Sequence, residues 1–157
     1  MMDWLLWLEQ SPLPSWVRES GSIWSYPTIL TLHTLGLGVL VGANAVVDLR
    51  VLGVASQFPL SSLSSLGPAM SAGLALNAVT GALLFAADAS VKGVQPVFFI
   101  KLGCIAVALV AMYRVMRAVR RAGAAGALAG TAGRGWAVLS LTCWIAAITA
   151  GRLMAYL

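Results

Sequence analysis

The stretch of sequence that decides the fold is PTILTLHTLGLGVLVGANAVVDL, Pro27–Leu49, whose only ionisable residues are His33 and, near its end, Asp48. About 20 residues of α-helix, at 1.5 Å per residue, cross a hydrocarbon core of roughly 30 Å. Lipid offers no hydrogen-bond partner to the backbone, so an open chain crosses it as a helix. The stretch therefore predicts a membrane-spanning helix.

Three further stretches of similar length and composition follow, at 68–87, 96–116 and 136–157. Pro27, Pro68 and Pro96 each stand at the start of a predicted span, where the missing N–H of proline breaks no helical hydrogen bond. The sequence thus predicts an all-α fold, an integral membrane four-helix bundle that occupies residues 27–157.

The composition agrees with a membrane protein and excludes a soluble domain. Of the 157 residues, 60% are apolar and 10% are charged, whereas soluble chains carry roughly 25% charged residues. The net charge of +5 does not indicate a nucleic-acid partner, because most arginines lie beside long apolar runs, as membrane topology requires. Cys104 and Cys143 lie within such runs and form no CxxC pair, so we expect them to be packing residues.

Residues 1–26 form a separate, Trp-rich segment that contains Trp4, Trp7, Trp16 and Trp24. Tryptophan favours the headgroup boundary, so this segment predicts an N-terminal interfacial amphipathic helix. A cleavable signal peptide is not expected, because no Lys or Arg precedes Arg18 to form a basic n-region. The stretches 50–67 and 120–135 are predicted as a Ser-rich loop and a flexible linker.

The distribution of basic residues predicts the orientation of the bundle. The face where the first and third spans end carries six arginines: Arg50, Arg114, Arg117, Arg120, Arg121 and Arg134. The opposite face carries Arg18 and Lys92. The positive-inside rule then places the first face in the cytoplasm and both termini outside. We expect a multi-pass protein of the bacterial cytoplasmic membrane.

Ionisable residues occur at one depth in the predicted bundle. His33, Lys101 and Arg152 each lie about two helical turns or less from the outer end of a span, and Asp88 lies at the end of the second. Each buried charge costs about 2.5–3.5 kcal/mol on insertion scales, so such residues are functional candidates. The structural alternatives are snorkelling by Lys101 and Arg152, an interhelical hydrogen bond from His33, and a solvent-exposed Asp88 paired with Lys92.

The residues around His33 are compatible with haem. Gly36 and Gly38 follow the histidine, and small residues beside an inward-facing His leave room for a macrocycle whose iron takes His as an axial ligand. Gly38 and Gly42 also form a GxxxG, which is typical of close helix packing. Asn44 and Asn77, both in mid-span, are expected to form interhelical hydrogen bonds.

A second axial ligand has three candidates, because His33 is the only histidine in the chain. These are Lys101 as the neutral amine, Met154, and a histidine from a second copy. Arg152, and also Arg18, would suit the haem propionates, which guanidinium groups pair with in a bidentate manner.

Four strings resemble a family of small four-helix bacterial membrane proteins known as a domain of unknown function. They are SIWSYP (22–27), HTLGLGVLVGANAVVDLRVLG (33–53), PVFFIKLG (96–103) and AAITAGRLMAYL (146–157). More distantly, the His of the first span, the Arg-Leu ending and the Lys of the third are similar to haem-containing protoporphyrinogen oxidases and copper-resistance membrane proteins. Resemblance to the oxidases implies haem b ligation by His33 and Lys101.

These features favour a haem b-binding membrane subunit that transfers electrons near the outer face and is not catalytic on its own. Other membrane subunits, a homo-oligomer or a periplasmic redox protein are the expected partners, besides the lipid bilayer. One alternative is a cofactor-free structural or assembly subunit, since the spans are rich in Ala and Gly. Another is a haem-dependent oxidase of a porphyrin-like substrate, for which the bundle offers few acid–base groups.

Overall fold

The chain is an all-α membrane helical bundle. A computed structural model describes residues 2–54, 59–125, 131–154 and 156, and no strand occurs in these ranges. The helices are α1 (Met2–Glu9), α2 (Pro12–Glu19), α3 (Tyr26–Leu52), α4 (Leu60–Leu63), α5 (Leu66–Ala87), α6 (Ala89–Lys92), α7 (Pro96–Ala125) and α8 (Thr131–Leu153). By length and composition, α3, α5, α7 and α8 can each cross a membrane. The four predicted spans are thereby confirmed.

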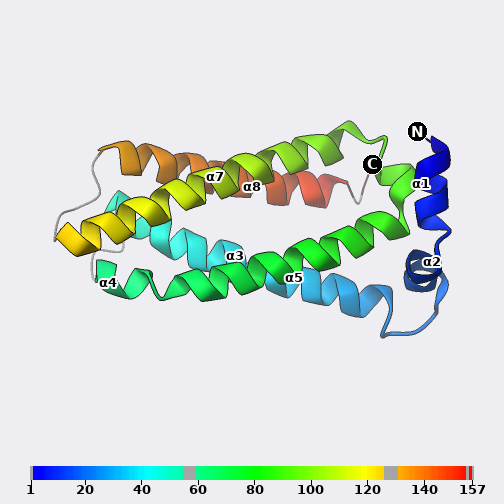
Figure 1. Ribbon diagram of the computed structural model, residues 1–157. Helices are drawn as coiled ribbons and strands as arrows, with labels where there is room; N and C mark the ends of the chain where they lie inside the picture. Colours follow the sequence, from blue (N-terminus) through cyan, green and yellow to red (C-terminus); the bar gives the residue numbers. More distant parts are fainter. Residues whose placement is uncertain (1, 55–58, 126–130, 155, 157) are drawn as a thin grey trace.

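The four long helices form two antiparallel pairs. Helix α3 packs along α5 and α7 packs along α8, while α3 also contacts α8 and α7 and so joins the pairs. Both chain termini lie at one end of the bundle, called here the terminal end, with α1 and α2 lying across it (Figure 1). The predicted antiparallel succession of spans therefore matches the structure.

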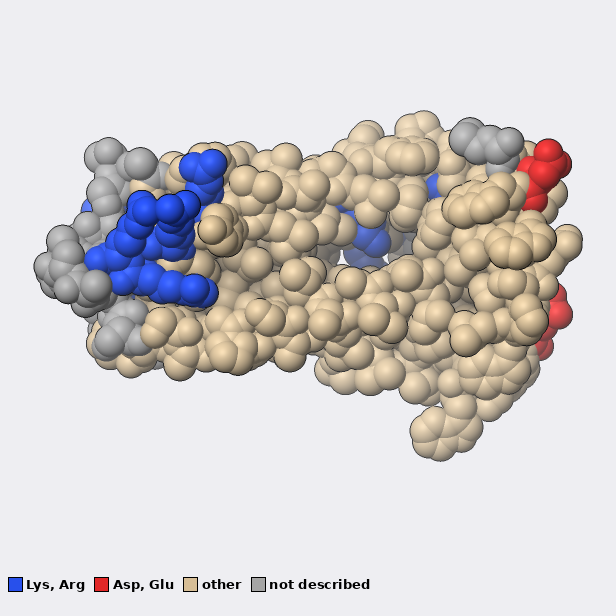
Figure 2. All heavy atoms as spheres, viewed as in Figure 1, with Lys and Arg blue, Asp and Glu red and all other residues tan. Residues whose placement is uncertain are grey.

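The opposite end of the bundle is called the arginine end. The predicted third span stops at 116, but α7 continues to Ala125 and carries the exposed Arg114, Arg117, Arg120 and Arg121. Arginine is a good helix former, so these residues extend the helix beyond its apolar part. The predicted linker 120–135 is helical at both ends, and residues 126–130 lie outside the described residues. Figure 2 shows Lys and Arg gathered at this end, and Asp and Glu at the terminal end.

The other predicted boundaries differ by a few residues. Helix α3 runs three residues past the predicted end and stops at Gly53, whose φ of 93° is the left-handed conformation that glycine adopts readily. The predicted loop 50–67 contains α4, and its residues 55–58 lie outside the described ones, as do Ala155 and Leu157 at the end of the fourth span.

The N-terminal segment forms two short helices rather than the predicted single one. Helix α1 ends at Glu9 and α2 begins at Pro12, because a proline lacks the N–H that would continue the first helix and disfavours helical backbone in the residue before it. Trp4, Trp7 and Trp16 are all about half exposed or more. This exposure agrees with the predicted position at a membrane interface.

Glu9 fixes α1 to the bundle. Its carboxylate accepts a hydrogen bond from the backbone N–H of Ser90, at 3.0 Å, and pairs with Arg18 of α2. Hydrogen bonds from the side chain and backbone of Ser90, followed by the nearby Arg18 charge, lower the pKa of Glu9. A lowered folded-state pKa stabilises the docked state above the ordinary glutamate pKa, about 4.3, and this contribution is lost as the pH falls through the folded value.

Acidification is therefore expected to loosen α1. Below about pH 4, amide hydrogen exchange of residues 2–9, corrected for its intrinsic pH dependence, should speed up in the wild type. In Glu9→Gln, which cannot ionise, exchange of α1 should already be faster at pH 7 and should not change with acid. Equal protection of α1 at pH 7 and pH 3 in the wild type would show that Glu9 does not fix this helix.

Glycines bring α3 and α5 into backbone contact. A Cβ atom built on Gly73 would lie 2.9 Å from both the Gly36 carbonyl oxygen and the Leu40 backbone nitrogen, and one on Gly36 would lie 3.1 Å from the Gly73 oxygen. Only glycine permits this approach, so the two helices are held at close range near their middle. This contact sets the height at which side chains of α3 meet those of α5.

The apolar core fills the half of the bundle nearer the arginine end. Every buried residue of the described part of α7 lies between Ala108 and Val119, and none lies in its first twelve residues, 96–107. The core in this half of the bundle includes Leu40, Val47, Val115 and Trp144. The terminal half of α7 is therefore not packed into the core, and the bundle is hollow at this level.

Candidate functional site

A cavity of about 430 Å³ occupies the terminal half of the bundle. This volume lies within the roughly 300–1,000 Å³ typical of small-molecule sites. All four spans and Lys92 of α6 line it, with these residues: Tyr26, Leu30, His33, Thr34, Leu37, Asn77, Gly81, Leu84, Phe85, Lys92, Phe98, Lys101, Ile105, Trp144, Ala147, Ile148, Gly151, Arg152 and Met154. Figure 2 shows a hollow in the side of the molecule with Lys or Arg atoms visible inside it.

His33 is held against α5 by two hydrogen bonds. Its ring Nδ1 lies 3.0 Å from the Thr80 hydroxyl oxygen, and its backbone carbonyl accepts a bond of 2.9 Å from the Asn77 side-chain amide. The second bond confirms the expectation that Asn77 joins two helices. Together they fix both the backbone and the ring of His33.

Thr80 determines which ring nitrogen of His33 carries the proton. The Thr80 hydroxyl has one hydrogen, and its oxygen lies 2.6 Å from the Leu76 carbonyl, which can only accept. The hydroxyl therefore donates to Leu76 and accepts from His33 Nδ1–H. In the neutral imidazole the other nitrogen, Nε2, then keeps its lone pair. A metal-binding histidine is oriented in the same way, by a hydrogen-bond acceptor on its other nitrogen.

The absence of a side chain at Gly81 provides the space for this ring. A Cβ atom on Gly81 would lie 3.0 Å from His33 Cε1 and 3.5 Å from Nδ1. The Nδ1–Cε1 edge of the imidazole therefore faces α5. Since His33 also lines the cavity, Nε2 is the nitrogen left for a ligand there.

Lys101 lines the cavity from α7, opposite the α3–α5 pair. Its Nζ and Cε atoms lie 3.5 Å from where a Cβ would stand on Gly151, so the lysine stem packs over the backbone of α8. Within the described part of the chain, no hydrogen bond or ion pair of Lys101 Nζ is observed. Its amine is thus a second nitrogen donor for the contents of the cavity.

Trp144 contributes an unpaired donor. Its side chain is 2% exposed, and its indole Nε1–H has no hydrogen-bond partner among the described residues. A buried N–H without a partner costs about 1–3 kcal/mol. The indole nitrogen itself exposes less than 1 Å² of surface, so it is not presented to the cavity.

The cavity lining is positively charged. Lys92, Lys101 and Arg152 line it, and no described Asp or Glu does. Lys92 is neutralised in part, because its Nζ lies 2.7 Å from an Asp88 carboxylate oxygen, which confirms the expected pairing. The excess of positive charge favours a ligand that carries acidic groups.

The predicted site residues divide into two groups. The structure brings His33, Lys101, Arg152 and Met154 to the one cavity. Gly36 is buried against α5, and Gly38 is exposed with no atom within 4 Å of a built Cβ. Neither glycine lines the cavity, because helix rotation turns both away from it; Gly81 and Gly151 provide the space instead.

Arg18 also lies apart from the cavity. Its guanidinium group is paired with Glu9 and Glu19, so it is not available at the cavity as the sequence suggested. The GxxxG glycines Gly38 and Gly42 leave no neighbour within 4 Å of a built Cβ. Close packing of α3 uses Gly36 instead.

Two phenylalanines lie between α5 and α7 at the cavity. The rings of Phe85 and Phe98 are stacked, with centroids 4.9 Å apart and planes 10° from parallel. Both residues line the cavity. They give it a flat apolar wall in the terminal half, where α7 is not packed into the core.

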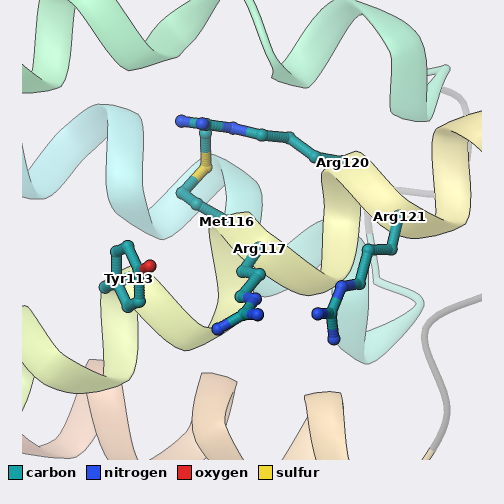
Figure 3. A pocket seen from close by; sticks show the side chains of 5 residues that line it. All are labelled: Tyr113, Met116, Arg117, Arg120 and Arg121. Carbon is teal, nitrogen blue, oxygen red and sulfur yellow. The ribbon is translucent and has the colours of Figure 1, made fainter.

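A second pocket, of about 330 Å³, lies on α7 at the arginine end. Figure 3 shows Arg117 and Arg121 projecting from one side of the helix, while Arg120 extends beside Met116 on the other. The guanidinium groups therefore diverge rather than converge on one ligand. This arrangement is expected of basic side chains at a membrane–water boundary.

A metal held by protein side chains alone is not supported. Among the described residues, no group of three or more His, Cys, Asp or Glu side chains is placed to hold a metal ion. A metal within a macrocycle needs only one or two axial donors, which His33 and Lys101 can supply. The donor set of the cavity thus fits a metalloporphyrin better than a bare ion.

Comparison with known proteins gives no assignment. No protein-family model matches this chain. Neither the curated proteins nor the solved structures contain a match.

Proposed function

We propose that the protein is an integral membrane haem b-binding subunit that transfers electrons near one membrane face. The observation that carries the proposal is the Leu76–Thr80–His33 chain of hydrogen bonds on a cavity-lining histidine. It engages Nδ1 and leaves Nε2 without a hydrogen-bond partner among the described residues. Haem iron takes a neutral imidazole nitrogen as its axial ligand. The bound group would supply one-electron chemistry; the protein residues bind and orient it.

Lys101 is the proposed second ligand. It reaches the cavity from α7, while His33 reaches it from α3, and its amine is not engaged by another described residue. Met154 also lines the cavity and is the alternative. A histidine from a second copy is not required while Lys101 occupies this position.

The remaining lining suits the periphery of a haem. Phe85, Phe98 and Ile105 present apolar surface to a macrocycle, and Arg152 presents a guanidinium that can pair with a propionate. An enzymatic role on a porphyrin-like substrate has less support, since no carboxyl group of the described residues lines the cavity for acid–base work.

The proposed location is a bacterial cytoplasmic membrane with the terminal end outside. The four exposed arginines of α7 lie at the opposite end, which the positive-inside rule assigns to the cytoplasm. A haem in the cavity would then be near the outer face, within reach of a periplasmic redox partner. Protease accessibility of a tag on each terminus in spheroplasts tests this: cleavage of both supports the orientation, and protection of both reverses it.

An assembly role alongside haem binding has one specific support. Gly38 and Gly42 form a small-residue surface on α3 that no described residue of the chain covers, and such surfaces favour contact with another membrane helix. A second copy or another subunit can pack there without blocking the cavity.

Titration of the purified protein with haem tests the proposed function. Saturable binding of one haem per chain, with a Soret band shifted from that of free haem, is the expected result. Metal-free protoporphyrin, which lacks the iron that His33 would bind, should bind more weakly by at least roughly tenfold. Equal affinity for both porphyrins would show that no side chain of the protein binds the iron.

Thr80→Val provides a test of the hydrogen bond behind His33. Valine keeps the shape of threonine but cannot accept from His33 Nδ1–H, so the ring loses its orientation. Loss of such partners typically weakens metal affinity roughly 10–100-fold, and we expect a haem Kd raised by that factor. Thr142→Ala, an exposed threonine of α8 bonded only to its own helix, should leave the Kd unchanged. Equal values for both variants would contradict a role for Thr80.

A further inference from the structure

A second polar site lies between α3 and α8, in the apolar core of the arginine half. Asn44, Asp48 and Ser140 form it, with side chains that are 1%, 0% and 0% exposed. None of the three lines the cavity of the terminal half. The polar cluster is therefore separate from the proposed haem site, and its chemistry is independent of whether haem binds.

Both hydrogens of the Asn44 amide are in use. Nδ2 donates to Asp48 Oδ2 at 2.7 Å and to Ser140 Oγ at 2.8 Å. The bond to Ser140 joins α3 to α8 and confirms the expected interhelical role of Asn44. Asn44 Oδ1 and Asp48 Oδ1 remain, and within the described part of the chain neither has a hydrogen-bond partner.

An ionised Asp48 would be a buried charge that lacks a counterion. In the described ranges, no Lys or Arg nitrogen lies within ion-pair distance of its carboxylate. In the arginine half, the neighbouring helices carry these basic residues: Arg50 on α3, Arg134 on α8, and Arg114, Arg117, Arg120 and Arg121 on α7. The Arg114 guanidinium lies over the ring of Trp136. A buried, unpaired carboxylate is among the costliest groups a protein interior can hold.

We propose that Asp48 is a proton-binding site, a carboxylic acid whose Oδ1–H donates to Asn44 Oδ1. One proton from water adds to one carboxylate oxygen, an O–H bond forms, no other covalent bond of the protein breaks, and the charge falls from −1 to zero. Together with the existing bond from Asn44 Nδ2–H to Asp48 Oδ2, the new hydrogen bond closes a ring of two hydrogen bonds between the Asn44 amide and the Asp48 acid. A single proton thereby satisfies both unpaired oxygens.

A metal cation is the competing occupant, and the donor set is too small for one. Hard cations such as Mg²⁺ or Ca²⁺ take about six or more oxygen ligands, whereas the cluster offers two unpaired oxygens in a fully buried position. The proton needs one donor bond and one acceptor, which is what Asp48 and Asn44 provide.

Protonation of Asp48 acts as a lock between α3 and α8. In either protonation state Asn44 can donate to Asp48 and Ser140. When the proton leaves, two unpaired acceptor oxygens and a buried negative charge remain, so the helices are held less tightly. Because the native state then binds a proton that the unfolded chain gives up, stability falls as the pH rises through the ionisation of Asp48.

Infrared spectroscopy tests the proton directly. In protein labelled with ¹³C-aspartate, the carbonyl stretch of a protonated carboxylic acid is expected in the wild type at pH 5, where exposed aspartates are ionised. The same band should be absent from Asp48→Asn and present in Asp88→Asn, whose carboxyl is 35% exposed at the other end of the bundle. A wild-type spectrum with carboxylate bands alone overturns the proton site.

Thermal unfolding in detergent, followed by tryptophan fluorescence, tests the lock. Between pH 5 and pH 9 the wild-type Tm should fall by on the order of 5 °C. Asp48→Asn keeps the ring, since its amide can donate to Asn44 Oδ1, so its Tm should lack this slope; Asp88→Asn should retain it. Equal slopes of Tm against pH in wild type and Asp48→Asn overturn the lock.

A wild-type Tm that rises with Na⁺ at constant ionic strength, while that of Asp48→Asn does not, would overturn the proton site in favour of a metal cation.

Discussion

His33→Ala protein, expressed with haem supplied and purified in detergent, is expected to show no Soret band. Alanine removes the only imidazole of the chain, and with it the nitrogen Nε2 that is proposed to bind the iron. Lys101 alone would have to hold the iron, and loss of one of two axial ligands should reduce retention through purification to background. The ratio of Soret to protein absorbance measures the effect.

Gly38→Ala is the matched control for this change. It lies on the same helix as His33, about one and a half turns further on, and its added methyl group meets no atom within 4 Å. This variant should retain the full Soret absorbance of the wild type. It also separates the two positions: a loss of haem in Gly38→Ala with retention in His33→Ala would assign the site to another face of α3.

Gly73→Leu should cause a large loss of stability. Even a Cβ at this position would lie 2.9 Å from two backbone atoms of α3, Gly36 O and Leu40 N, and backbone atoms cannot rotate away as a side chain can. Overpacking typically costs about 1–3 kcal/mol, and leucine adds further carbon atoms beyond Cβ. We therefore expect roughly 3 kcal/mol or more, a fall in Tm of about 6–12 °C.

The substitution should also weaken the cavity site at a distance. When α3 and α5 are forced apart, His33 and Thr80, at 3.0 Å in the wild type, separate as well. Gly103→Ala is the control, because glycine 103 of α7 is exposed with no neighbour within 4 Å of a built Cβ. A Gly73→Leu protein with the wild-type Tm would contradict the backbone contact between α3 and α5.

The fold could be predicted from the sequence because hydropathy and length fix where a chain can cross a membrane. Depth could be predicted too: counting residues from the span ends places His33, Lys101 and Arg152 in one layer, and the structure places all three at one cavity. The ends of the helices were harder to predict. The arginines of α7 extend a helix that hydropathy alone would end at residue 116.

Helix rotation and pairing could not be predicted. Which glycines face the cavity depends on which helices pack together: Gly36, Gly38, Gly81 and Gly151 were all possible. The packing is set by backbone contacts such as that of Gly36 with Gly73. Thr80 was missed for the same reason: its position three residues after Asn77 puts both on one face of a helix, but nothing in the sequence gives its height relative to His33.

The pair Asn44–Asp48 did carry a sequence signal. Residues four apart on a helix face each other, and the two side chains are indeed bonded. Arg50, the nearest opposite charge along the chain, is only two residues from Asp48, and residues two apart do not face each other on a helix. Spacing within one helix was thus more informative about this site than the proximity of opposite charges along the sequence.

The reduced-minus-oxidised difference spectrum of wild-type protein, purified after expression with haem supplied, tests the central claim most directly. If haem b binds as proposed, the spectrum should show the sharp visible and Soret features of a six-coordinate haem b, at one haem per chain. A flat difference spectrum from folded, monodisperse protein would contradict it and would leave the cavity to a ligand without a redox-active iron.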